Sequence, residues 1–378
     1  MKIEQKKFTN SKGWETIRNK NFNAADCNLV IVFGSTSLLR DESLYNTIRS
    51  NYAAADLIIN STSGEIIDTQ VNDESISLTA ITFDRTQLKT GSVDIAAYAS
   101  SFDAGCALAK QLDFTDLKNV LIISDGQKVN GSELVLGLQD TLPKDTIITG
   151  GLAGDGARFQ STLVGLNEFP IEGRIVAIGF YGDKLTITYG SVGGWDSFGP
   201  ERLITKSIAN VLYELDNQPA LDIYKKYLGD YAKDLPGSGL LFPLSIRMEN
   251  EDSVVRTILN VNEADKSVTF AGNMPEGNYS RLMKANFDRL VDGASNAAVN
   301  SLDENSHKPE LAILISCVGR KLVLNQRIEE EVEAVRAIYG NTTAITGFYS
   351  YGEISPSFNF AKCALHNQTM TITTFSEE

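Results

Sequence analysis

The hydrophobic and polar positions along the chain repeat one pattern three times. Each copy has a short apolar run of strand length, a polar stretch with helical spacing, a second short apolar run and a glycine-containing loop. The copies comprise residues 29–33, 41–52, 57–59 and 61–66; residues 120–124, 132–142, 146–148 and 150–156; and residues 311–317, 327–339, 343–346 and 347–354. Such self-similarity predicts one supersecondary unit built three times.

A further stretch of β-prone residues follows each loop. Residues 75–83 and 368–375 alternate apolar and polar side chains, which predicts half-buried strands, whereas residues 174–180 are apolar on both faces and predict a central strand. The two short apolar runs of each copy are expected to pair in parallel around the helix, and the later strand to join antiparallel. The predicted fold class is therefore mixed α/β (α+β), with repeated strand-helix-strand-loop-strand units forming mixed sheets covered by helices.

The third helical stretch has the clearest apolar stripe. Ile328, Val332, Val335 and Ile338 recur at helical spacing, which predicts that this side packs on a sheet. The charged residues between them are expected to form a solvated face rather than a binding site. They are Glu329, Glu330, Glu331, Glu333 and Arg336.

Residues 196–298 depart from the repeated pattern. Residues 203–216 and 220–227 have spacing that suggests helices, while 254–261 and 268–270 read as strands. Gly193, Gly194 and Trp195, followed by Gly199 and Pro200, form the best boundary candidate because glycine and proline interrupt regular structure. The chain is accordingly expected to form two related domains, residues 1–196 and 197–378.

Composition and charge restrict the classes of function. The chain has 378 residues, 42% hydrophobic and 22% charged, with a net charge of −14, which disfavours nonspecific nucleic-acid binding and anionic membrane surfaces. The four cysteines form no C-x-x-C pair. The N-terminus lacks a signal-peptide core, and no apolar run is long enough to span a bilayer. A cytoplasmic protein without cofactor or membrane insertion is expected.

Several motifs, taken together and in order, resemble the FIST domains. Residues 316–320, 347–354 and 366–370, with residues 213–224, resemble the C-terminal FIST domain, and residues 61–66 and 150–156 resemble the N-terminal one. The resemblance covers roughly residues 29 to 375. It implies a bacterial signal-transduction sensory module for small ligands, amino acids among them.

Many FIST proteins also carry a histidine kinase, cyclase or chemotaxis output domain. Here the two FIST-like halves take up the length of the chain, so a stand-alone form is expected that signals by binding a separate partner protein. Assembly of the chain with itself is also compatible with the sequence.

The loops that end in glycine and an acid are the first candidates for ligand contact. Glycines such as Gly151 let a backbone approach a ligand closely, and loop N–H groups can hold a carboxylate. Asp155 or Glu353 is positioned in sequence to hold a ligand ammonium group. The alternative is that these acids, and Glu65 in the first copy, bind neighbouring backbone N–H groups.

The third copy contributes the remaining candidates. Arg320 follows a strand end at Ser316 and Cys317, where α/β sheets often bind ligands, and its guanidinium suits a carboxylate. A surface ion pair is the alternative for Arg320. Tyr349 and Tyr351 alternate, so they are expected to face one side and to line a pocket or the core.

Two other classes of function stay open. An enzyme would use Cys317 with His307 or His366 as its base, or an acid pair such as Asp155 and Glu353. A buried, inert cysteine is the alternative. An interaction scaffold would show an exposed apolar patch and no deep pocket. The scattered histidines and cysteines argue against a metal site, and residues 150–156 match no nucleotide-binding motif.

Overall fold

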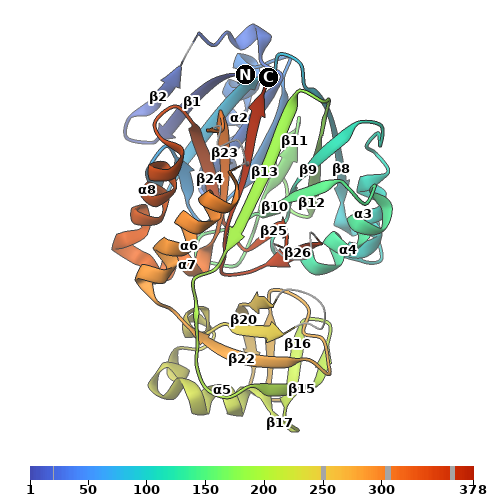
Figure 1. Ribbon diagram of the computed structural model, residues 1–378, viewed down its shortest axis with the longest axis vertical. Helices are drawn as coiled ribbons and strands as arrows, with labels where there is room; N and C mark the ends of the chain where they lie inside the picture. The colour runs from blue at the N-terminus through green and yellow to red at the C-terminus, as the bar shows by residue number, and fades with distance from the viewer. Residues whose placement is uncertain (20, 248–252, 303–307, 358–361) are drawn as a thin grey trace.

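The computed structural model describes residues 1–19, 21–247, 253–302, 308–357 and 362–378. It has a large body of three sheets and, below it in Figure 1, a smaller sheet domain. The two chain ends lie together at the far end of the body, where the amino group of Met1 is 3.7 Å from Glu377 Oε2. The expected fold class, mixed α/β with mixed sheets and two domains, is confirmed.

The threefold repetition of the sequence is a threefold repetition of structure. In each repeat two parallel strands flank a crossover helix, and a later strand pairs antiparallel with the first. The parallel strands and helices are β3 (Leu29–Gly34), α2 (Glu42–Asn51) and β4 (Asp56–Ser61); β9 (Leu117–Ser124), α4 (Gly131–Thr141) and β10 (Ile147–Leu152); and β23 (Leu311–Cys317), α8 (Ile328–Tyr339) and β24 (Ala344–Ser350). The antiparallel strands are β7 (Ser75–Thr82), β12 (Arg174–Tyr181) and β27 (Met370–Glu377).

Each repeat also lends strands to a neighbouring sheet. The sheet orders are β11-β4-β3-β7-β1-β2, β26-β25-β10-β9-β12-β8 and β13-β27-β23-β24-β5-β6. Each later antiparallel strand has a second antiparallel neighbour. These neighbours are β1 (Lys2–Thr9), β8 (Gln87–Asp94) and β13 (Leu185–Val192), and β2 (Gly13–Asn19) extends the first sheet beyond β1. The exchanged strands are β5 (Glu65–Ile67) with β6 (Gln70–Asn72), β11 (Val164–Leu166), and β25 (Gly352–Pro356) with β26 (Cys363–His366). The exchange is cyclic, so the three sheets interlock into one body.

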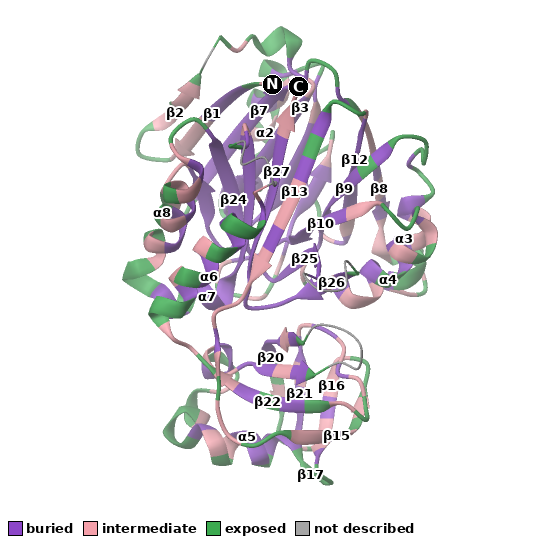
Figure 2. Ribbon diagram, in the orientation of Figure 1, coloured by how far each residue is buried: buried purple, intermediate pink, exposed green. Residues whose placement is uncertain are grey.

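The core of the body lies where the three sheets face one another. Alternate side chains of β3, β9 and β23 form one cluster, because successive residues of a strand point to opposite faces. These side chains are Leu29, Ile31, Phe33, Leu121, Ile123, Leu311, Ile313 and Ile315. Figure 2 shows the inner strands of the body buried, with exposed positions on the outer helices and loops, and the edge strands β2, β8 and β13 are only partly buried.

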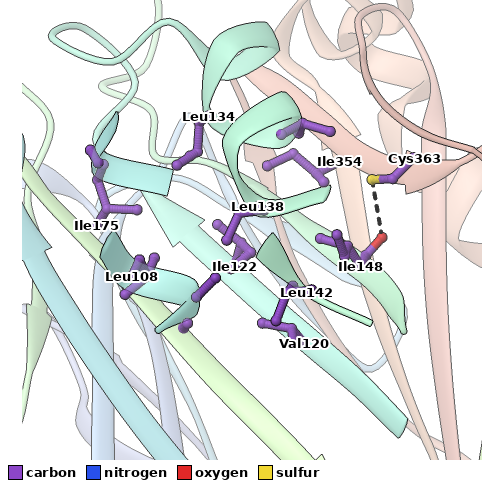
Figure 3. Close-up of a cluster of buried hydrophobic side chains, with 14 of the residues drawn as sticks. Leu108, Val120, Ile122, Leu134, Leu138, Leu142, Ile148, Ile175, Ile354 and Cys363 are labelled. Carbon is purple, nitrogen blue, oxygen red and sulfur yellow. Dashed lines mark hydrogen bonds between the residues drawn. The ribbon is translucent and has the colours of Figure 1, made fainter. Parts of the chain in front are cut away.

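Helices cover the outer faces of the sheets. On the second sheet, α3 (Ser101–Ala109) and α4 place Leu108, Leu134 and Leu138 over Val120 and Ile122 (Figure 3). Helices α3 and α4 pack closely at Gly137, where an added Cβ would lie 2.1 Å from the Phe102 carbonyl oxygen. Short helices α1 (Thr36–Leu39) and α7 (Val318–Leu324) follow β3 and β23.

The prediction that the alternating strands are half-buried is wrong. Every residue of β7 is buried, and in β27 only the last two are partly exposed. The polar residues face a neighbouring sheet instead of solvent. Ser77 Oγ donates to the Ile66 carbonyl of the third sheet at 3.2 Å. Thr79 Oγ1 accepts at 3.4 Å from Gln5 Nε2 of its own sheet, which also donates to the Ile345 carbonyl of the third sheet at 2.9 Å. Polar side chains of the first sheet therefore provide hydrogen bonds between sheets.

The small domain is inserted between β13 and α6 (Phe287–Asn300). Its strands are β14 (Asp196–Ser197), β15 (Arg202–Ile208), β16 (Val211–Leu215), β17 (Gln218–Pro219), β18 (Leu244–Arg247), β19 (Val254–Arg256), β20 (Ile258–Asn262), β21 (Ser267–Phe270) and β22 (Tyr279–Lys284), with α5 (Ala220–Leu228) packed against them. The expected helix at 220–227 and strand at 268–270 are confirmed, whereas the strand expected at 254–261 is divided at Thr257 into β19 and β20, which pair with different strands. The expected helix at 203–216 is wrong, because these residues form the β15–β16 hairpin, whose turn places Ala209 at φ +51°.

The small domain begins with β14, directly after residues 193–195. The sheets of the body, however, draw strands from both sides of residue 196. β13 pairs with β27, and β10 pairs with β25. The two sequence segments 1–196 and 197–378 therefore share one set of sheets.

Candidate functional site

The three glycine-containing loops meet at the end of the body nearest the small domain. Ser63 N donates to the Tyr349 carbonyl at 2.8 Å, and Tyr349 N donates to the Gly64 carbonyl at 2.9 Å. Gly154 N donates to the Ser61 carbonyl at 3.0 Å. Loops far apart in the sequence thus hold one another through their backbones, at the points where the chain leaves one sheet for the next.

The loop glycines permit this packing. A Cβ on Gly154 would lie 2.3 Å from Ser63 Oγ and 2.8 Å from its backbone nitrogen. A Cβ on Gly151, which lies within β10, would approach Ile315 Cγ2 to 2.7 Å. Protein atoms therefore occupy the space that was expected to admit a ligand at Gly151.

Glu65 and Glu353 take equivalent places in the first and third repeats. Glu65 accepts hydrogen bonds from Ser75 N at 3.2 Å and Ser75 Oγ at 2.7 Å. Glu353 accepts them from Thr369 N at 3.2 Å and Thr369 Oγ1 at 2.9 Å. Ser350 Oγ adds a bond of 2.6 Å to Glu353. Each carboxyl thus holds the start of the following antiparallel strand.

Burial strongly affects the protonation of these two carboxyls. Glu65 is 1% exposed and Glu353 is fully buried. Burial raises the pKa of Glu65 to about 7 and that of Glu353 to about 8, against the hydrogen bonds that favour the charged form. The backbone-binding alternative is therefore what the geometry supports for both acids.

Asp155 has different partners. It accepts hydrogen bonds from Thr36 Oγ1 at 2.7 Å, from Arg158 Nε at 2.9 Å and from Ser161 N at 3.3 Å. Burial opposes the charged form, but the bonds from Arg158 and Thr36 prevail and lower the pKa of Asp155. This carboxylate links the second repeat to the first.

Arg320 lies in a closed polar cluster. It is fully buried and donates to Glu331 Oε2 from Nε at 3.1 Å and from Nη2 at 2.8 Å. Glu331 Oε1 accepts from the Tyr349 hydroxyl at 2.6 Å and from Ser316 Oγ at 3.1 Å. We name these four residues, Arg320, Glu331, Tyr349 and Ser316, the clasp.

Two expectations fail at the clasp. Glu331 was expected on the solvated face of its helix, but it is fully buried because Arg320 and two hydroxyls satisfy its carboxylate. The surface ion pair considered for Arg320 is likewise wrong, because neither its side chain nor that of Glu331 is exposed.

Tyr349 and Tyr351 do not face the same side, so that expectation is also wrong. Tyr349 packs under the helices of the third repeat, whereas Tyr351 packs in the cluster of the second. The chain crosses from β24 to β25 between them and so changes sheets. The Tyr351 ring stacks on Phe159, with ring centroids 4.5 Å apart and planes 15° apart. Phe348, which directly precedes Tyr349, faces the central core.

Cys317 lies at the end of β23 and is 1% exposed. Burial, with the negative charge of Glu353 added to it, raises the pKa of its thiol well above the usual value. This environment disfavours the thiolate that a nucleophile requires. His366 Nε2 lies 3.0 Å from the Ser355 carbonyl oxygen, and His307 lies outside the described residues.

A cavity of about 220 Å³ lies at the junction of the body and the small domain. It brings together the loop after β9, the start of α4, and side chains of the small domain. Its lining residues are Gly126, Gln127, Lys128, Val129, Asn130, Leu152, Asn210, Leu259, Ala271 and Tyr351. Of the eight predicted ligand residues, Tyr351 is the one that lines it.

The sequence contained one signal for this cavity. Asn130 is the N-cap of α4, where its side chain accepts from Ser132 N and Glu133 N at 3.1 and 3.3 Å. A strand end followed by a capped helix is a common binding position in α/β sheets. Asn210, Leu259 and Ala271 had no such signal, because only the fold brings the small domain to this place.

Within the described parts of the chain, no group of three or more histidine, cysteine, aspartate or glutamate side chains is placed to bind a metal ion. The same parts of the chain contain no helix that is both long and apolar enough to cross a bilayer.

These observations define a two-domain α/β protein whose interlocked repeats support a small cavity at the domain junction. Residues 28–218 match the FIST N domain, and residues 220–356 match the FIST C domain. The chain therefore belongs to the FIST family, whose domains are sensory domains of signal transduction.

Three individual proteins share lower similarity with the chain. An uncharacterized protein of Methanocaldococcus jannaschii is 26% identical over 240 residues, which cover 58% of this chain and 42% of that protein, so the chain spans less than half of its length. A chorismatase crystal structure aligns over 98% of both chains, with 10% identity and a TM-score of 0.34. A cyanuric acid hydrolase from A. caulinodans aligns over 94% of this chain and 92% of its own, with 8% identity and a TM-score of 0.36. At these TM-scores, neither structure carries an argument about this chain.

Proposed function

We propose that the chain is a cytoplasmic sensor that binds a small metabolite, an amino acid or a related compound, in the junction cavity and signals through a separate partner protein. The observation that carries the proposal is the cavity of about 220 Å³, whose lining comes from both the body and the small domain. A ligand there contacts both domains and favours one arrangement of them, which is how binding becomes a signal.

The lining favours a small polar ligand over a large apolar one. The cavity is smaller than the pockets that usually hold drug-sized molecules. Its lining includes the polar residues Gln127, Asn130, Asn210 and Tyr351. Stacking on Phe159 fixes the Tyr351 ring. Such a wall offers hydrogen bonds to a ligand of amino-acid size.

A charged pair beside the cavity favours an amino acid. Lys128 is the charged residue among those that line the cavity, and its Nζ lies 3.0 Å from Glu172 Oε2. A zwitterionic ligand can replace this contact by giving its carboxylate to Lys128 and its ammonium group to Glu172. Binding is proposed in preference to catalysis because burial raises the pKa of the Cys317 thiol.

A thermal-shift screen of the amino acids and related metabolites tests the proposal. At a ligand concentration of 100 Kd, binding adds about 2.7 kcal/mol to the free energy of unfolding. Leu259→Trp fills the cavity and is expected to abolish the shift. Ile208→Trp changes an exposed apolar residue of the same domain outside the cavity and is expected to keep it. No stabilising metabolite, or equal binding by both variants, would contradict the proposal.

The charge argument has its own variants. Lys128→Met is expected to weaken binding of an amino acid at least about tenfold, the effect of 1.4 kcal/mol. Lys118→Met removes an exposed lysine from the same β9 region and is expected to leave the affinity unchanged. Equal affinity of the wild type and Lys128→Met would exclude this pairing while leaving the cavity in place as the site.

A further inference from the structure

Two segments of the chain connect the body to the small domain, and Arg320 lies where both reach the body. The outgoing segment follows β13, and its Gly193 carbonyl accepts a hydrogen bond from Arg320 Nη1. The returning segment leads into α6, and the Leu290 carbonyl in the first turn of this helix accepts from Arg320 Nη2 at 2.7 Å. One buried guanidinium therefore joins the outgoing connection to the start of the helix that receives the returning one.

The clasp ties this guanidinium to the strand ends of the third repeat. Glu331 holds Arg320 through Oε2, while its Oε1 accepts from Tyr349 on β24 and Ser316 on β23. Tyr351, two residues beyond Tyr349, lines the junction cavity. Residues 349–351 therefore belong both to the clasp, through Tyr349, and to the lining of the cavity, through Tyr351.

The connecting segments have little room to move while the clasp is formed. Gly194 has φ +108°, and a Cβ there would lie 2.1 Å from the Arg289 carbonyl oxygen. A Cβ on Gly293 would lie 2.5 Å from the Gly193 carbonyl oxygen. Trp195 Nε1 donates to the Gln368 carbonyl at 2.8 Å. The outgoing segment is therefore pressed against α6 and the start of β27.

We propose that the clasp is a conformational device that holds the small domain against the body, and that its release lets this domain move and opens the junction cavity. The claim about domain position rests on the contacts of Arg320 with Gly193 and Leu290. The small domain also contacts the body directly, where Arg256 Nη1 donates to the Leu365 carbonyl at 2.9 Å and Gln368 Nε2 donates to the Leu240 carbonyl at 3.2 Å, so clasp release is expected to loosen the domain rather than detach it. The claim that a ligand uses this motion rests on the proposed function. The connecting segments are the hinge, because they are the two crossings of the chain between body and domain.

Distance measurements on the ligand-free protein test the device separately from any ligand. Spin labels on Leu136→Cys of α4 and Ile208→Cys of β15 report the position of the small domain, since both side chains are exposed. A Cys106→Ser background removes the partly exposed native cysteine. Arg320→Met with Glu331→Met removes both buried charges together, which avoids leaving either unpaired. This variant is expected to broaden the label distance distribution.

The matched control removes another arginine–acid pair, formed by Arg336 of α8 and Asp68 between β5 and β6. Arg336 binds Asp68 and the Gly340 and Thr343 carbonyls, all within the body. Arg336→Met with Asp68→Asn is expected to leave the distance distribution as in the wild type. Equal distributions in the wild type and the clasp variant would overturn the proposal, as would equal broadening in the clasp and control variants.

A milder pair of variants covers the case in which the double variant does not fold. Tyr349→Phe removes one hydrogen bond of the clasp, whereas Tyr339→Phe removes a buried hydroxyl of α8 that contacts Ser301 outside the clasp. Broadening in Tyr349→Phe but not in Tyr339→Phe supports the device. Unchanged distances in both would overturn it. A metabolite found in the thermal-shift screen is then expected to narrow the distribution of the clasp variant, and failure of that step alone would count against the ligand and not against the hinge.

Discussion

Arg320 and Glu331 form a buried ion pair, with Arg320 Nη2 2.8 Å from Glu331 Oε2 and neither side chain exposed to solvent. Breaking such a pair from one side leaves an uncompensated charge in the interior. Arg320→Met is therefore expected to lower the free energy of unfolding by about 3–5 kcal/mol. Replacing both residues with methionine is expected to cost less than the single change. Chemical denaturation followed by circular dichroism measures both variants.

An exposed pair at the start of α8, the helix of Glu331, provides the control. Arg327 and Glu330 are both more than 40% exposed, with Arg327 Nη2 2.7 Å from Glu330 Oε2. Arg327→Met is expected to change the free energy of unfolding by less than about 1 kcal/mol. If Arg320→Met costs no more than Arg327→Met, the buried pair does not have the role assigned to it here.

The two buried glutamates predict an unusual dependence of stability on pH. Burial raises the folded-state pKa of Glu353 to about 8 and of Glu65 to about 7, from an ordinary value of 4.5. Between the ordinary value of 4.5 and these raised values, the folded protein binds more protons than the unfolded chain. The stabilisation is therefore complete below about pH 4.5 and is lost as the pH rises through 7 and 8. Glu353→Gln is expected to reduce this loss.

Asp155 provides a comparison of opposite sign. Its pKa is lowered in the folded state, so its contribution is present above the unfolded pKa and is lost as the pH falls through the folded value. Asp155→Asn is expected to lower stability at neutral pH and to have less effect in acid. Thermal unfolding of the wild type and both variants from about pH 2.5 to about pH 9 measures the slopes, because the Asp155 contribution is lost only below the ordinary carboxyl pKa of about 4. A Glu353→Gln protein with the same slope as the wild type between pH 5 and 8 would show that Glu353 is not the titrating group.

The repeats were predictable from the sequence, but the strand exchange was not. A short apolar run such as β23, followed by the stripe of Val332 and Val335, defines a strand and a helix locally. Pairing of β10 with β25 joins residues about 200 positions apart, and no local pattern specifies which sheet receives a loop. The helix predicted at residues 203–216 was wrong because short apolar segments fit helical and strand spacing alike.

The candidate site was predicted only in part, because the burial of a polar residue depends on partners that are not adjacent to it in the sequence. Glu331 lies in a run of acids that looks uniformly solvated. The clue was Arg320, an arginine among apolar residues of α7 that must find an acid if buried. Tyr351 was predicted as a ligand residue because of the loop in which it lies. The cavity that it lines could not be predicted, because part of the lining comes from the small domain, whose position the sequence does not specify.

Two glycines of the parallel pairs test the close contact between strands. A Cβ on Gly347 would lie 1.9 Å from the Leu314 carbonyl oxygen, and one on Gly150 would lie 1.9 Å from the Ile122 carbonyl oxygen. The obstacle in each case is backbone of the paired strand, which cannot move without breaking the ladder. Gly347→Ala is expected to destabilise the protein by about 3 kcal/mol or more.

Gly237 in the small domain is the matched position, because a Cβ there meets nothing within 4 Å. Gly237→Ala is expected to stay within about 0.5 kcal/mol of the wild type. Thermal unfolding of the two variants, followed by soluble yield, makes the comparison. Equal stability of Gly347→Ala and Gly237→Ala would mean that the strands have more room than the contact implies.

The reactivity of Cys317 decides between the binding proposal and a cysteine enzyme. Its thiol is 1% exposed, and burial raises its pKa, so it is expected to react with a thiol reagent at least about 100-fold more slowly in the native protein than in urea. Cys106 is partly exposed and is expected to react first. Mass spectrometry after timed iodoacetamide labelling assigns each rate to its cysteine. If Cys317 of the native protein reacts faster than Cys106 at pH 7, Cys317 is an activated nucleophile and the cysteine-enzyme alternative is favoured over the binding proposal. Cys317→Ser would then be expected to abolish the enzymatic activity.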